Sequence, residues 1–214
     1  MAGRPPLRFK RRDTSTQGNV NQLLGRNIRG EIAYRAARLI AEGGVTDLAT
    51  AKRKAARQMA VTKAGFLPDD DEVDAALRAY QSIFQVDSQP QECRALRHIA
   101  VDAMRWLDRF SPWLIGSVMT GTANRYSPIE FEIVTDEAKR LEMFFVNLGM
   151  PFATKVRVAH GYAIYRISVY EITFQEVQIV IATYPTHAAR AGRVQSGNLK
   201  RACAQLTDVE ALAA

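Results

Sequence analysis

The apolar residues of this 214-residue chain change their spacing near its midpoint. Up to about residue 110 they recur every three or four positions, which is the period of a helix with one buried face. Beyond Ser111 and Pro112, apolar and polar residues alternate in short runs, which is the period of a strand with one buried face. We therefore predict an α+β fold in which a helical region over 26–110 precedes a mixed β-sheet with flanking helices over 111–214.

The first half of the chain predicts four helices. Apolar spacing places one helix over 27–42 and a second after Thr46, which can cap it. The third helix follows four consecutive acids at 69–72, and the fourth covers 93–110 after a break at 88–91. Acids at a helix N-terminus complement the helix dipole and cap the first turn, so we assign the cluster this role rather than metal binding.

The second half predicts five strands and two helices. Asp136 begins the longer helix and Gly149 ends it, and a capping box at 207–210 begins a short final helix. His160 and Gly161 form a candidate hairpin turn between two of the strands. The predicted strands cover 113–115, 129–133, 154–158, 162–170 and 176–184.

Composition excludes several classes of protein. Hydrophobic residues make up 47% of the chain and charged residues 24%, which excludes collagen, a coiled coil and a wholly disordered chain. No apolar run reaches the ~18 residues of a membrane-spanning helix, and the basic N-terminus lacks the apolar segment of a secretory signal. Cys93 and Cys203 lie far apart, which argues against a disulfide framework or a zinc site. We therefore expect a cytoplasmic protein without a membrane partner, and its oligomeric state is left open.

Most of the positive charge lies at the N-terminus. The net charge is +7, and residues 1–30 hold seven Arg or Lys against one Asp. We predict that residues 1–25 form a flexible basic arm that can contact RNA or another polyanion. The alternative is a solvated terminus with no specific partner, and the same two interpretations apply to the basic helix face at 52–57. The arm residues with a weak nucleic-acid prediction are Arg8, Lys10, Arg11 and Arg12.

The most informative segment begins at Gly116 and Ser117, directly after the first predicted strand. A turn of small residues lets backbone N–H groups and a hydroxyl face a phosphate. Glu130 and Glu132 then lie two positions apart on the next strand, so their side chains share one face of the sheet. Two neighbouring carboxylates repel each other unless a proton or cation lies between them, which favours a divalent metal. With substrate phosphates completing its ligands, Mg²⁺ at such acids supports phosphoryl or nucleotidyl transfer.

The spacing over 116–131 resembles the signature of the DNA polymerase β-like nucleotidyltransferase superfamily, in particular its small, uncharacterised bacterial members. In that family a strand leads into a Gly-Ser turn, two acids on the next strand bind metal ions, and a third acid lies on a later strand. The order of predicted elements extends the resemblance to roughly 113–184. The positions that match the signature are Gly116, Ser117, Gly121, Ala123, Ser127 and Ile129.

The resemblance implies that a nucleoside monophosphate is transferred from a nucleoside triphosphate (NTP) to an acceptor, with Mg²⁺ or Mn²⁺ as cofactor. The sequence does not identify the acceptor. The resemblance further implies that Glu130 and Glu132 are catalytic and that they bind the metal together with Glu176. The residues implied to bind the phosphates are Gly116, Ser117, Gly121 and Arg125.

Two positions depart from the family pattern. Pro128 stands at the first acid position and Gln178 at the third, and neither is a good Mg²⁺ ligand. One hypothesis is an active enzyme that uses Glu130, Glu132 and Glu176. A second is a catalytically degenerate member that binds a nucleotide, a nucleic acid or a protein partner. A third rejects the match and makes the glutamates the solvent-facing side of a half-exposed strand.

Overall fold

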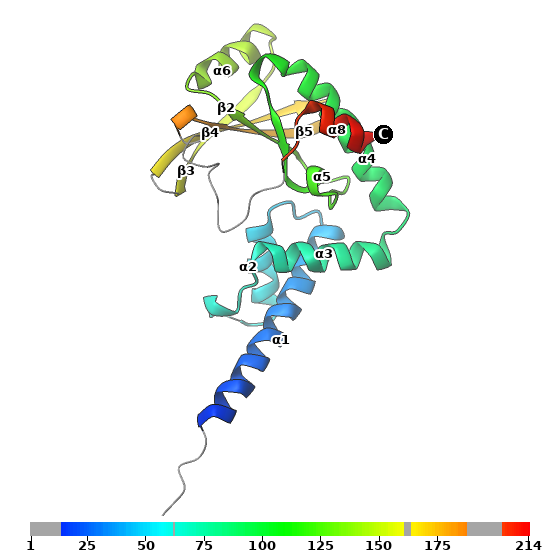
Figure 1. Cartoon of the computed structure of the whole chain (residues 1–214), viewed down its shortest axis with the longest axis vertical. Helices are drawn as coiled ribbons and strands as arrows, with labels where there is room; N and C mark the ends of the chain where they lie inside the picture. Colours follow the sequence, from blue (N-terminus) through cyan, green and yellow to red (C-terminus); the bar gives the residue numbers. More distant parts are fainter. Residues whose placement is uncertain (1–13, 62, 161–163, 188–202) are drawn as a thin grey trace, which may run out of the picture.

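Two structural regions follow one another along the chain, and the long helix α4 (Ser88–Trp106) connects them (Figure 1). The N-terminal region is helical, and the C-terminal region is a mixed sheet with helices packed against it. The predicted α+β class is confirmed. The computed structural model describes residues 14–61, 63–160, 164–187 and 203–214.

The helical region consists of α1 (Thr14–Ala41), α2 (Leu48–Gln58) and α3 (Asp70–Phe84), with a 3-10 helix at Ala64–Phe66. Helix α1 begins well before residue 27, so the predicted arm over 1–25 overlaps it from Thr14 onward. Buried apolar residues of the three helices form one core cluster. The arm residues Arg8, Lys10, Arg11 and Arg12 lie outside the described residues.

Aspartates cap the N-termini of α2 and α3. The Asp69 carboxylate accepts a hydrogen bond from the Glu72 backbone N–H at 2.8 Å, and the Glu72 carboxylate accepts one from the Asp69 N–H at 2.8 Å. This capping box gives the acidic cluster the role that the sequence predicts. Helix α2 is capped by Asp47 rather than Thr46, because the Asp47 carboxylate accepts a hydrogen bond from the Thr50 backbone N–H at 2.8 Å.

Helix α4 begins earlier and ends earlier than its apolar pattern predicts. The predicted break at 88–91 is wrong, since Pro90 lies in the first turn of the helix. A backbone N–H in that turn has no helical acceptor, so proline is tolerated there. The regular helix ends at Trp106, and a 3-10 turn at Asp108–Phe110 leads into the sheet.

Five strands form one mixed sheet with the order β1-β2-β5-β4-β3. Strands β2 and β5 are parallel, and all other neighbours are antiparallel. Helix α6 (Ala138–Asn147) follows β2, as predicted. The short helix α5 (Gly116–Thr120) follows β1, where the sequence predicts a turn and a loop. The strands are β1 (Trp113–Ile115), β2 (Ile129–Val134), β3 (Phe152–His160), β4 (Ile164–Phe174) and β5 (Val177–Tyr184).

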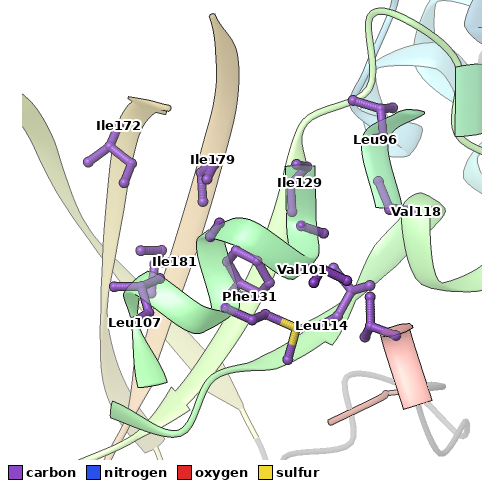
Figure 2. Packing of buried hydrophobic residues seen from close by; sticks show 14 of the residues in the cluster. Leu96, Val101, Leu107, Leu114, Val118, Ile129, Phe131, Ile172, Ile179 and Ile181 are labelled. Atoms are coloured by element: carbon purple, nitrogen blue, oxygen red, sulfur yellow. The ribbon is translucent and has the colours of Figure 1, made fainter. Parts of the chain in front are cut away.

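The main hydrophobic core lies on one face of this sheet. Side chains of α4, α5, α6 and the C-terminal helix α8 (Leu206–Ala213) pack against it. Figure 2 shows core residues of β2 and β5, among them Ile129, Phe131 and Ile179, together with Leu96 and Val101 of α4. The strand residues at the centre of this core, none of which has exposed surface, are Ile129, Phe131, Ile133, Ile179 and Ile181.

The predicted starts of β5 and α8 are also wrong. Gln175 and Glu176 have φ angles of +47° and +65° and form the turn between β4 and β5, so Glu176 is not part of a strand. Gln205 and Asp208 form the capping box of α8, two residues before the predicted one. Strands β3 and β4 are paired as predicted, but Gly161 of the predicted turn lies outside the described residues.

No helix in the described part of the chain is both long and apolar enough to span a membrane.

Candidate functional site

Glu130 and Glu132 lie on the sheet face opposite to the main core. Strand side chains alternate, so burial of Phe131 in the core directs both glutamates to the other side. Glu130 lies in register with Ile115 of β1 and Val180 of β5. Both glutamates are partly exposed, and the two therefore share a solvent-accessible face.

The Glu130 carboxyl group lies directly against Gly116. A Cβ atom at position 116 would be 2.2 Å from Glu130 Oε2, closer than two such atoms approach each other. Gly116 also has a φ angle of +73°, which glycine adopts without steric cost. The backbone conformation thus favours glycine at this position, and any larger residue would displace the Glu130 carboxyl group.

A pocket of about 120 Å³ opens beside Glu130 on this face. Its polar lining comes from Glu130 of β2, Arg157 of β3 and Tyr184 of β5. Apolar residues such as Ile167 and Val169 of β4 line the rest. A carboxylate can bind a metal ion and a guanidinium can bind phosphate oxygens, so this pocket combines the two contacts that a metal-bound nucleotide needs.

Ser117 lines a different and smaller pocket of about 40 Å³, between α5 and the helical region. Asp74 of α3 and Asn124 also line this pocket. Burial raises the pKa of the Asp74 carboxyl, and the positive charge of Arg78, 3.9 Å away, opposes the increase. A space of this size holds only a few water molecules. The hydroxyl of the Gly-Ser turn is therefore not part of the pocket beside Glu130.

Gly121 and Arg125 lie away from the Gly116–Glu130 contact. Gly121 ends α5 with a φ angle of +84°, at the opposite end of that helix from Gly116. The Arg125 guanidinium is 5.1 Å from the centre of the Tyr126 ring. Neither Gly121 nor Arg125 is among the described residues that line the pocket beside Glu130.

Glu176 is also distant from the two glutamates. The β5 neighbour of Glu130 is Val180, four positions beyond Glu176, which is about 13 Å along a strand. The predicted strand over 176–184 included Glu176, but its φ angle of +65° places this residue in the hairpin turn.

The two departures from the family pattern lie side by side. Pro128 directly precedes Ile129, and Gln178 directly precedes Ile179. These two isoleucines are partners in the parallel strands β2 and β5. Within the described ranges, no three His, Cys, Asp or Glu side chains are grouped so that they could bind one metal ion. The residues that fit a metal here are Glu130 and, about 7 Å further along the strand, Glu132. Mg²⁺ is commonly held by only one or two carboxylates when substrate phosphates supply further ligands.

The basic face of α2 is partly used within the fold. The Lys52 ammonium lies 2.6 Å from the Asp70 carboxylate, and Arg53 donates a hydrogen bond to the Ala49 carbonyl at 3.2 Å. Lys54 and Arg57 are exposed, so only part of this face is open to a polyanion.

Sequence reasoning missed Gln81, Gln89 and Arg97, whose side chains bind the segment between Gly116 and Glu130. Gln81 and Gln89 are buried although glutamine is usually exposed. Gln81 could have been identified, because it lies four positions after Leu77 on the buried face of a predicted helix. Gln89 could not, because it lies in the predicted break at 88–91.

Comparisons with known proteins give no family assignment. No family model matches the chain, and no curated protein matches it. One solved structure with some similarity is that of a cytoplasmic RNA terminal U-transferase, with a TM-score of 0.35 and 17% sequence identity. The match covers 50% of this chain and 33% of that protein. A similarity this low defines neither the fold nor the function.

Proposed function

We propose that this chain is a nucleotidyltransferase-like protein that binds an NTP together with a divalent cation at the sheet face beside Gly116 and Glu130. The observation that supports this proposal is the contact of the Glu130 carboxyl group with Gly116. It joins the Gly-Ser turn to the acidic strand, the two parts of the sequence signature, at one place. In this proposal Mg²⁺ lies at Glu130, with Glu132 as a second carboxylate, and it neutralises the nucleotide phosphates.

The role of the remaining pocket residues follows from their chemistry. Arg157 presents five N–H donors and a permanent positive charge, which suits it to bind phosphate oxygens. Tyr184 offers a ring and a hydroxyl at the other side of the same pocket. The NTP would therefore lie across β2, β5, β4 and β3 on the face opposite to the core.

Binding without transfer is the form of this function that the residues favour. The two altered positions, Pro128 and Gln178, are neighbours, and Glu176 is in a turn, so two of the three family acids lack a carboxylate equivalent. Transfer of a nucleoside monophosphate is the second candidate. It is supported by the shared face of Glu130 and Glu132, which places two carboxylates on the side of the sheet where the pocket opens.

The test uses α-labelled NTPs with Mg²⁺ or Mn²⁺, purified full-length protein, and cell RNA and protein as acceptors. The variant is Glu130→Gln, and the matched control is Glu137→Gln at the exposed start of α6. We expect the wild type and the control to bind the NTP, and Glu130→Gln to bind it at least ~10-fold more weakly, since a ligand carboxylate is lost. Label transferred by the wild type but not by Glu130→Gln would establish the second candidate. Absence of NTP binding by the wild type would refute both.

A further inference from the structure

Residues 122–124 of the loop between α5 and β2 (121–128) are buried, although loops normally run over the surface. Thr122, Ala123 and Asn124 expose 4% or less of their surface. A buried segment must find partners for its backbone polar groups, because an unpaired polar group that is removed from water destabilises the fold. The source of these partners identifies what holds the loop in place.

Side chains of α3 and α4 bind the carbonyl groups of residues 121–123, whereas the N–H groups of the same three residues donate to the Ser117 carbonyl. The Gln89 amide donates to the carbonyls of Gly121 and Ala123, both at 2.8 Å. The Gln81 amide donates to the Thr122 carbonyl at 2.9 Å. Three consecutive carbonyl groups of the loop are thus bound by two buried glutamines of the helical region.

The segments on either side of these carbonyls are held in the same way. Arg97 of α4 donates to the Val118 carbonyl of α5 at 3.1 Å. The Asn124 amide donates to the Ile40 carbonyl at the end of α1 at 3.0 Å. The loop is therefore fixed to α1, α3 and α4 along its length.

This loop connects the two halves of the candidate site. Gly116 begins the short helix before the loop, and Glu130 lies two residues after it. Pairing of Ile115 with Glu130 brings the two strands together, and the loop holds α5, which begins at Gly116, against the helical region. Gln81 and Gln89 are not among the residues that line the pocket beside Glu130, so their effect on the site passes through the loop that they bind.

We propose that Gln81 and Gln89 are positioning residues that hold α5 and the loop in place between Gly116 and Glu130, and that the helical region is for this reason part of the nucleotide site. The proposal rests on the proposed function for its consequence on NTP binding. Its structural part, that the two glutamines keep residues 116–130 ordered, stands without that function.

The test compares Gln89→Leu, which removes both donors at nearly constant volume, with Gln91→Leu on the exposed side of α4. Gln81→Leu is a milder variant that removes a single hydrogen bond. Hydrogen exchange is measured by peptide, and NTP affinity is measured with Mg²⁺. We expect exchange over 116–130 to increase at least ~10-fold in Gln89→Leu, with a smaller increase in Gln81→Leu and none in Gln91→Leu. NTP affinity should fall ~10-fold in Gln89→Leu at a temperature where the protein remains folded.

Three results would overturn this proposal or separate it from the proposed function. Unchanged exchange over 116–130 in Gln89→Leu refutes positioning. An equal increase over the whole sheet also refutes it, because it shows a general loss of stability. If the wild type binds no NTP, the proposed function fails, while exchange confined to 116–130 would still support the positioning role.

Discussion

Replacing Gly116 with alanine tests the contact on which the site depends. The new Cβ would lie 2.2 Å from Glu130 Oε2, whereas ordinary contact begins at 3.4 Å, so the carboxyl group must move by about 1.2 Å. It is the flexible end of a side chain, so this movement costs little free energy. The φ angle of +73° adds strain of about 1–2 kcal/mol for an L-residue.

Gly149 provides a matched control for this substitution. Its φ angle is +63°, and an added Cβ would meet no atom within 4 Å. Gly149→Ala therefore carries the same backbone strain without displacing a carboxylate. Each variant should lower Tm by about 2–8 °C, since 1 kcal/mol corresponds to ~2–4 °C for a protein of this size.

The two variants should differ in NTP affinity. We expect Gly116→Ala to weaken Mg²⁺-dependent NTP binding at least ~10-fold, because a ligand carboxylate moves by about half a metal–oxygen bond length. Gly149→Ala should bind as the wild type does. Thermal unfolding and equilibrium binding are measured on the same samples. Equal affinities in the two variants would refute the role of the Gly116–Glu130 contact.

Two further predictions concern other parts of the chain. Burial raises the pKa of Tyr170 to about 12, and its hydrogen bond to Glu142 adds to the effect. The neutral phenol is favoured in the folded state, so its stabilisation is complete below pH 10 and is lost as the pH rises to about 12. The free energy of unfolding, measured with urea, should fall by about 2 kcal/mol over this pH range in the wild type but not in Tyr170→Phe. Identical pH profiles of the two proteins would contradict the assignment. Deleting residues 1–13, which hold five Arg or Lys, should weaken polyanion binding in a salt-dependent way. The slope of log K against log salt should fall by up to about 4, and an unchanged slope would exclude the arm as a contact.

The sequence was sufficient for the class of fold and for the order of elements in the sheet region. Apolar spacing locates β1, β2 and β5 well, because one face of each strand is buried in the same core. It fails at the ends of elements, because the backbone conformation of a single residue determines where a helix or strand begins. Pro90 indicates a break but lies in a first turn, and Glu176 continues the strand alternation but has a positive φ.

The candidate site was only partly predictable. That Glu130 and Glu132 share a face follows from strand alternation alone. The contact of Glu130 with Gly116 depends on the register of β1 against β2, which places Ile115 beside Glu130. The glutamines at 81 and 89 bind backbone carbonyls far away in sequence, and a local pattern cannot specify such partners.

The most direct test is a crystal structure of the full-length protein with Mn²⁺ and a non-hydrolysable ATP analogue, using the anomalous signal of manganese. We predict a manganese peak bonded to the Glu130 carboxylate, with nucleotide phosphates as further ligands and Gly116 in contact with the same carboxylate. A nucleotide bound elsewhere on the protein, or bound here with no metal at Glu130, would contradict the proposed function.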